Sequence, residues 1–144
     1  MSESTIKSMT VIALAAVAAG PSYIGMHWGL LPDKVPIHFG LLGEADNWGP
    51  RITVLIGPAV SIFLFVMLTI GGRSSKGSQP DARQLLAVYR LVMGLMLSYM
   101  QAATVNVALG RASGLGAWFA PAFLVAVFAP LGFYHLTGKK LPKK

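Results

Sequence analysis

Four stretches of mostly apolar residues divide this chain, at residues 10–31, 52–70, 85–109 and 118–136. A helix needs about 20 apolar residues to cross the hydrocarbon core of a bilayer, so each stretch has the length of a span. None of them shows the period-two alternation of a half-buried strand. The pattern therefore predicts an all-α integral membrane protein, a single membrane domain over residues 1–144 built as a four-transmembrane-helix bundle.

The composition supports this class. Hydrophobic residues make up 54% of the chain and charged residues only 12%, whereas soluble globular chains carry about 25% charged residues. So few charges cannot cover the surface of a water-soluble fold of this size. The chain has no cysteine, which excludes disulfides, cysteine-ligated zinc, iron–sulfur clusters and thiol catalysis.

The net charge of +7 comes from residues that do not form one patch, so nucleic-acid binding is not indicated. The N-terminus, the connection at 71–84 and the C-terminus together hold nine lysines and arginines, counting Arg90 at the membrane edge. The two other connections hold only Lys34, Arg51 and Arg111. We expect the protein in the inner (cytoplasmic) membrane. By the positive-inside rule, both termini should lie in the cytoplasm and residues 32–51 outside it.

The connection at 32–51 has the composition of an ordered loop rather than a slack linker. Prolines hold their preceding residues extended, and glycines permit positive φ. An Asp-Asn pair followed by glycine favours turns. These features are Pro32, Pro36, Gly40, Gly43, Asp46, Asn47 and Gly49. We therefore expect an ordered extracytoplasmic cap between the first and second helices.

The same loop carries the pattern Leu-Pro-Asp-x-Val-Pro-x-His-Phe at 31–39 and Gly-Glu-x-Asp at 43–46, followed by an aromatic residue and glycine. This pattern resembles a bacterial domain of unknown function that forms the N-terminal half of Sdp-type toxin-immunity membrane proteins. The domain also occurs in short stand-alone membrane proteins. The resemblance implies a membrane location and, for some members, an immunity role. Family members usually carry a lysine shortly after the aromatic residue, where this chain has Gly-Pro-Arg at 49–51.

Four side chains of the loop are of types that bind divalent cations: Asp33, His38, Glu44 and Asp46. Compact metal-binding spacings are absent from the sequence, so the same residues also suit turn capping or contact with a partner. His27, beside Trp28 at the outer end of the first helix, is either an interfacial anchor or a further contributor near His38. Whether a metal binds is left open, and no cofactor is expected.

The third helix carries unusual residues for a membrane span. Arg90, Gly94, Ser98 and Gln101 follow steps of four, four and three residues and therefore share one face. Polar groups at membrane depth face the bundle or a cavity. This face is expected either to pack against other helices or to line a pocket for a quinone, lipid or peptide.

No catalytic constellation is present in the sequence, and the four expected spans contain no acidic residue. We therefore expect a non-enzymatic interaction or binding module within the lipid bilayer. It would be an immunity-like protein or an accessory subunit of a larger membrane complex, bound to a protein partner or to a second copy of itself. The alternative is a small membrane enzyme or carrier that uses His38, Glu44 and Asp46 at the outer rim to bind a metal, lipid or quinone-like ligand.

Overall fold

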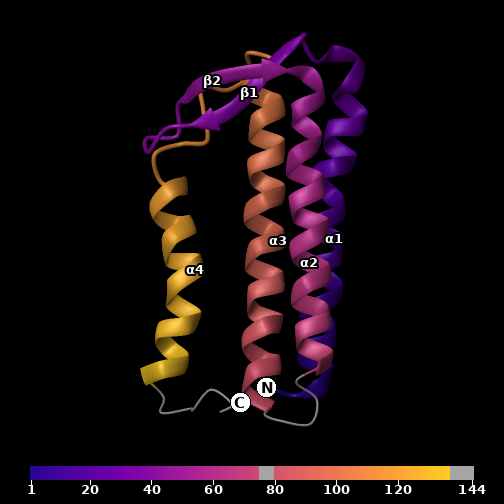
Figure 1. The fold of residues 1–144 in the computed structure, drawn as a ribbon, viewed down its shortest axis with the longest axis vertical. Helices are drawn as coiled ribbons and strands as arrows, with labels where there is room; N and C mark the ends of the chain where they lie inside the picture. The colour runs from indigo at the N-terminus through magenta and orange to yellow at the C-terminus, as the bar shows by residue number, and fades with distance from the viewer. Residues whose placement is uncertain (75–79, 137–144) are drawn as a thin grey trace.

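The computed structural model describes residues 1–74 and 80–136, and within these it places residues 73–74, 80–81 and 133–136 by their backbone only. The described residues form four α-helices that run alongside one another and a β-hairpin that lies across one end (Figure 1). The helices are α1 (Glu3–His27), α2 (Ile56–Ser74), α3 (Pro80–Ala108) and α4 (Phe119–Leu136). The strands are β1 (Lys34–Phe39) and β2 (Ala45–Pro50), and the short 3-10 helices are η1 (Trp28–Leu30) and η2 (Arg51–Leu55).

Three helical segments in the described residues are long and apolar enough to cross a membrane: Glu3–Leu30, Arg51–Gly72 and Ala82–Ala108. The apolar part of α4, Phe119–Gly132, is shorter. The apolar helices indicate a membrane protein. Spanning length is shown for three of the four expected helices, and the fourth is apolar over the side chains that the structure describes.

The helices begin at different positions from the apolar stretches. α1 starts at Glu3 rather than at residue 10, because the Ser2 side chain accepts a hydrogen bond from the Thr5 N–H at 3.1 Å and caps the helix. α3 is already helical at Pro80, the first residue described after the gap, before its apolar stretch begins at residue 85. The Ser2 cap therefore sets the start of α1, and hydrophobicity does not.

The sequence predicted an all-α fold, and this prediction is wrong for residues 32–51, which contain a β-hairpin. β1 and β2 pair antiparallel, with Val35 opposite Gly49 and Phe39 opposite Ala45. The register shifts on both sides of His38, next to Pro36, which has no N–H to give to the ladder. The turn closes where the Gly43 N–H donates to the Gly40 carbonyl at 2.9 Å, and Gly43 has a φ of 84°. β2 combines the polar Asp46 and Asn47 with Trp48, Gly49 and Pro50, so its sequence lacks the alternation that identifies a strand.

α1 and α3 approach each other closely at Gly94. A Cβ atom on Gly94 would lie 3.2 Å from the Ala13 carbonyl oxygen and 3.6 Å from the Ala16 Cβ. Ala13 and Ala16 are themselves buried. Small residues at such positions let helix backbones approach within a membrane, so this side of α3 forms a close contact with α1.

A single amide connects three helices a little further along α3. Gln101 is only 2% exposed, and its Nε2 donates to the Ser61 Oγ of α2 at 2.8 Å. Its Oε1 lies where a Cβ on Gly20 of α1 would come within 2.6 Å, and its Cγ lies beside Gly57 of α2. The two glycines make the space that the glutamine side chain fills.

Candidate binding groove beneath the hairpin

The start of the hairpin is anchored in a small core at the end of the bundle. Val35 of β1 is fully buried and packs in a cluster with Ile24, Leu31, Val54 and Val105. These residues come from α1, the segment after it, η2 and α3, so β1 is fixed to the helices on both sides of it.

The tip of the hairpin is fixed to a distant part of the chain, the connection between α3 and α4. The Leu115 N–H donates to the Gly43 carbonyl at 2.7 Å, and the Tyr99 hydroxyl donates to the Leu115 carbonyl at 2.9 Å. A Cβ on Gly43 would lie 2.7 Å from the Gly116 carbonyl oxygen. The hairpin therefore bridges from α1 to the start of α4.

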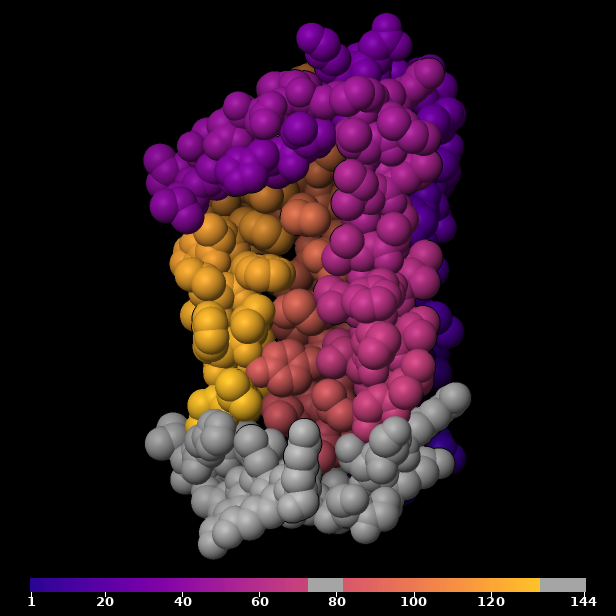
Figure 2. All heavy atoms as spheres, in the orientation of Figure 1, coloured from indigo at the N-terminus to yellow at the C-terminus, as the bar shows by residue number. Residues whose placement is uncertain are grey.

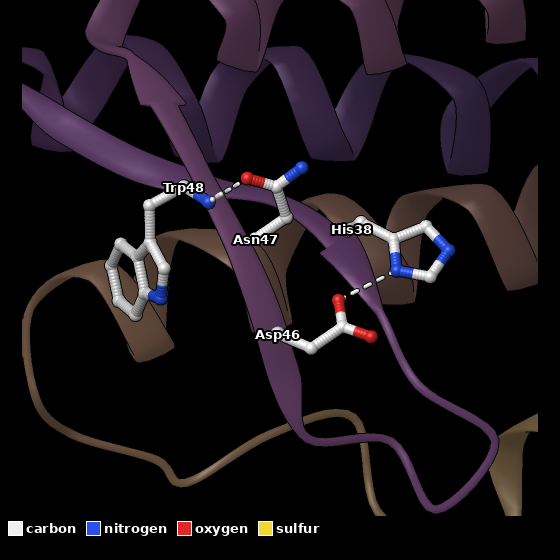
Figure 3. A network of polar contacts seen from close by, with 4 residues as sticks. All are labelled: His38, Asp46, Asn47 and Trp48. Carbon is white, nitrogen blue, oxygen red and sulfur yellow. Dashed lines mark hydrogen bonds and ion pairs between the residues drawn. The ribbon is translucent and has the colours of Figure 1, made fainter.

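His38 and Asp46 meet on the exposed side of the hairpin. The His38 Nδ1 lies 2.6 Å from Asp46 Oδ1, and Figure 3 shows the two side chains turned toward each other from neighbouring strands. A carboxylate oxygen only accepts, so Nδ1 carries the proton in this hydrogen bond. The side chains are 66% and 43% exposed, and such exposed pairs contribute at most about 1 kcal/mol to stability.

The other candidate ligands do not join this pair. The Asp33 carbonyl accepts from the Arg51 N–H at 2.8 Å, and the Glu44 carboxylate lies against Gly40 at the turn. His27 Nδ1 is 2.9 Å from the Tyr23 carbonyl oxygen, and its ring lies 4.2 Å from the Tyr23 ring. In the part of the chain that the structure describes, no three His, Asp or Glu side chains are close enough to hold a metal ion.

A groove lies directly beneath β1. Its larger hollow, about 390 Å³, is bounded by the hairpin, by Met100 of α3 and by Phe119, Phe123 and Leu124 of α4. Its smaller hollow, about 180 Å³, lies on the α2 side and is lined by residues including Val54, Val60 and Thr104.

Three side chains line both hollows: Ile37, Phe39 and Met100. Figure 2 shows the resulting recess, with α2 and α4 standing apart, α3 behind them and the hairpin above. We call this recess the hairpin groove.

The α4 wall of the groove is held to α3 by aromatic contacts and one hydrogen bond. The Tyr99 ring of α3 has its centroid 5.6 Å from that of Phe119 and 5.0 Å from that of Trp118. Within α4, the Phe119 and Phe123 centroids are 6.0 Å apart. Nearer the other end, the Tyr89 hydroxyl donates to the Val127 carbonyl at 2.7 Å. The residue pattern did not point to these side chains because Tyr99 lies off the polar face of α3, although the four-residue spacing of Phe119 and Phe123 is a signal for such a contact.

The groove offers few reactive groups. The Thr104 hydroxyl donates to the Met100 carbonyl at 2.8 Å, and the Gln101 Nε2 donates to the Ser61 Oγ. His38 lies at the rim and already bonds to Asp46. Such a lining can hold an apolar segment.

Residues 9–62 match the family model described as a domain of unknown function, DUF1648. This segment contains most of α1, the hairpin, η2 and the start of α2. It supplies the roof and the α2 wall of the groove, and residues after 62 supply α3 and the α4 wall. No curated protein and no solved structure matches the chain.

Proposed function

We propose that this chain is a non-enzymatic membrane protein that binds a transmembrane helix of a partner in the hairpin groove. The observation that carries the proposal is the one-sided packing of α4, which contacts mainly α3 and leaves its α2-facing side open. Packed helices lie about 8–10 Å apart. A partner helix that packs on α3 between α2 and α4 would therefore contact all three helices and complete the bundle.

The chemistry of the groove supports packing rather than reaction. Its lining is mainly aliphatic and aromatic. The Thr53 and Thr104 hydroxyls and the Gln101 Nε2 bond within the chain, and only the Gln101 Oε1 has no hydrogen-bond partner among the described residues. Between helices in lipid, van der Waals packing supplies most of the association free energy, because lipid tails are as apolar as the side chains. An open recess is what such packing requires.

Site-specific photocrosslinking in native membranes tests the proposal. A photoreactive residue replaces Val60 or Leu124, which line opposite sides of the groove, or Leu14 of α1 as an exposed control. We expect one discrete protein adduct from both groove positions and none from Leu14. The mass of the adduct separates a different partner from a second copy of this chain. Lipid adducts alone at all three positions would contradict the proposal.

A second function is favoured by His38, which lines the larger hollow while bonding to Asp46. An amphipathic lipid or quinone-like ligand would place its tail in the groove and its polar head at this pair, as a carrier or small membrane enzyme requires. The same crosslinking would then give an adduct of small mass. His38→Ala would reduce that adduct, whereas Lys34→Ala on the same strand would not.

We propose that the hairpin end of the bundle faces the outside of the inner membrane, with both termini in the cytoplasm and α4 as a fourth span. The support is the excess of lysines and arginines on the other side. Because the chain has no cysteine, thiol labelling has no background. Leu42→Cys, at an exposed position, should react with impermeant reagents in intact cells. Ser75→Cys and Lys143→Cys should react only after the membrane is opened, and labelling of Ser75→Cys in intact cells would reverse the orientation.

An immunity-like role of the Sdp type is the narrower form of the helix-binding proposal, and an accessory subunit is the other. The match of residues 9–62 to DUF1648 and the resemblance of the loop pattern support the first. A toxin encoded beside this chain should then kill cells that lack it and spare cells that produce it. Stoichiometric co-purification with subunits of one membrane complex would instead support the accessory role.

A further inference from the structure

At the opposite end from the hairpin, a second cavity of about 480 Å³ lies between α1, α2 and α3. Its lining combines apolar side chains with three basic ones and one acidic one: Lys7, Arg83, Arg90 and Glu3. In the sequence, Arg90 stands out only as part of the polar face of α3. The position of its guanidinium in this cavity suggests a further role.

Arg90 is a buried cation that forms no ion pair with any side chain that the structure describes. It is only 7% exposed, and its Nε has no hydrogen-bond partner. A guanidinium has five N–H donors, and an unpaired buried charge is costly in a membrane. Arg90 therefore has donors available for a ligand.

The side chain extends toward the end of the bundle. A Cβ on Gly72, near the end of α2, would lie 3.5 Å from Arg90 Nη1. Eight residues separate Arg90 from Ala82, where the spanning segment of α3 begins, which is about 12 Å along the helix. The Arg90 backbone thus lies within the span while its guanidinium reaches toward the headgroup level, as long basic side chains do.

The charged side chains that line the cavity do not cancel one another. Glu3 pairs with Arg83 through two contacts, at 2.8 and 3.2 Å. Among the described residues this is the only ion pair at the cavity, so Lys7 and Arg90 leave two uncompensated positive charges. The hydroxyls of Thr10 and Thr69 donate to their own helices, at 2.8 and 2.7 Å.

We propose that this cavity binds a phosphate group, held by the Arg90 guanidinium and the Lys7 ammonium. Arginine pairs with phosphate through two parallel hydrogen bonds, and lysine contributes a point charge. Two sources carry this chemistry, the headgroup of an anionic phospholipid and free inorganic phosphate. The place of the cavity within the spanning segments and its apolar lining favour the lipid, since basic pockets between membrane helices bind such headgroups.

Thermal unfolding of the purified full chain in neutral detergent tests the site. Phosphatidylglycerol should raise the unfolding temperature of the wild type more than phosphatidylcholine with the same acyl chains. Lys7→Gln should weaken the phosphatidylglycerol effect about fivefold in lipid concentration, and Arg90→Gln about tenfold or more. Arg111→Gln, an exposed arginine at the other end of the bundle, removes the same charge and should change nothing.

The remaining arms separate the outcomes. Sodium phosphate, compared with sodium chloride at equal ionic strength, should not raise the unfolding temperature as phosphatidylglycerol does. If it raises the unfolding temperature equally, the phosphate site stands but its ligand is soluble. If Arg90→Gln does not fold, Lys7→Gln and Arg90→Lys decide, because Lys7 is exposed and Arg90→Lys keeps the charge but loses the paired hydrogen bonds. The proposal is overturned if both lipids stabilise the wild type equally. It is also overturned if the Lys7 and Arg90 variants retain the full phosphatidylglycerol effect.

Discussion

The two helix contacts on either side of α3 are built from different side chains. Toward α1, Gly94 faces Ala13 and Ala16, so the two backbones come close together. Toward α4, the rings of Tyr99 and Phe119 stand between the helices. Small residues give α1 and α3 a close contact, whereas large rings hold α4 at a distance and leave space beside it.

This difference accounts for the position of the hairpin groove. The unit of α1, α2 and α3 meets at Gln101, whose amide is enclosed by glycines on both neighbouring helices. α4 has no such junction and depends on the aromatic contacts and the bond from Tyr89. The proposed binding of a partner helix would use the open side of α4.

The largest effect should come from filling the α1–α3 contact. Gly94→Leu places a branched side chain against the Ala13 carbonyl, and we expect it to cost about 3 kcal/mol or more, because overpacking a tight contact separates the helices. Leu95→Ala is the control, since Leu95 is 51% exposed. Thermal unfolding in detergent measures both variants. Equal recovery of folded protein would show that α1 and α3 do not depend on close approach.

A smaller loss is expected at the tip of the hairpin, which holds the start of α4. Gly43→Ala should cost about 2 kcal/mol, because Gly43 has a φ of 84° and a Cβ there meets the Gly116 carbonyl oxygen. Gly110→Ala is the control that measures only the cost of placing a Cβ at positive φ. Gly110 has a φ of 68°, but no atom lies within 4 Å of a Cβ there. If the two variants lose equal stability, the contact between hairpin and connection contributes nothing.

The junction at Gln101 is tested through its partner. Ser61→Ala leaves the buried Gln101 amide nitrogen without an acceptor, and we expect a loss of about 1.5 kcal/mol. Ser22→Ala is matched to it, because the Ser22 hydroxyl also donates to the carbonyl four residues earlier but is exposed. Urea or thermal unfolding should rank the Ser61 variant well below the Ser22 variant. The same stability for both would remove Gln101 as a junction.

The smallest effect belongs to α4. Tyr89→Phe removes the hydrogen bond to the Val127 carbonyl, and hydrogen bonds between membrane helices contribute about 0.6 kcal/mol on average. Unfolding measurements should therefore show a loss near that value. Hydrogen exchange should rise along α4 while α1 stays unchanged. A rise in both helices would mean that α4 is part of the same rigid unit.

The periodicity of α3 was sufficient to group Arg90, Gly94, Ser98 and Gln101 on one face, since residues three and four apart in a helix are neighbours. The structure buries Arg90, Gly94 and Gln101 and half-buries Ser98. Which helix each residue meets was not predictable. The match of Gly94 to Ala13 and of Gln101 to Gly20 and Gly57 depends on how the helices are rotated and staggered.

For the candidate ligands of the loop, too, the sequence predicted the residue types and the structure decided which of them meet. Their residue types suggested a shared site, yet only His38 and Asp46 meet. That meeting requires the antiparallel pairing of β1 and β2 with a shifted register around His38. Backbone hydrogen bonds and the missing N–H of Pro36 set this register, and neither is visible as a hydrophobic pattern.

The sequence by itself determined the apolar helices and their approximate lengths, because transfer of about 20 apolar residues into hydrocarbon depends on composition alone. Only the tertiary structure decided that a hairpin covers the end of the bundle, that its tip bonds to Leu115, and that α4 stands apart. Gly43 and Leu115 are far apart in the chain. Contacts over such separations depend on the packing of whole helices, which a local pattern of residues does not encode.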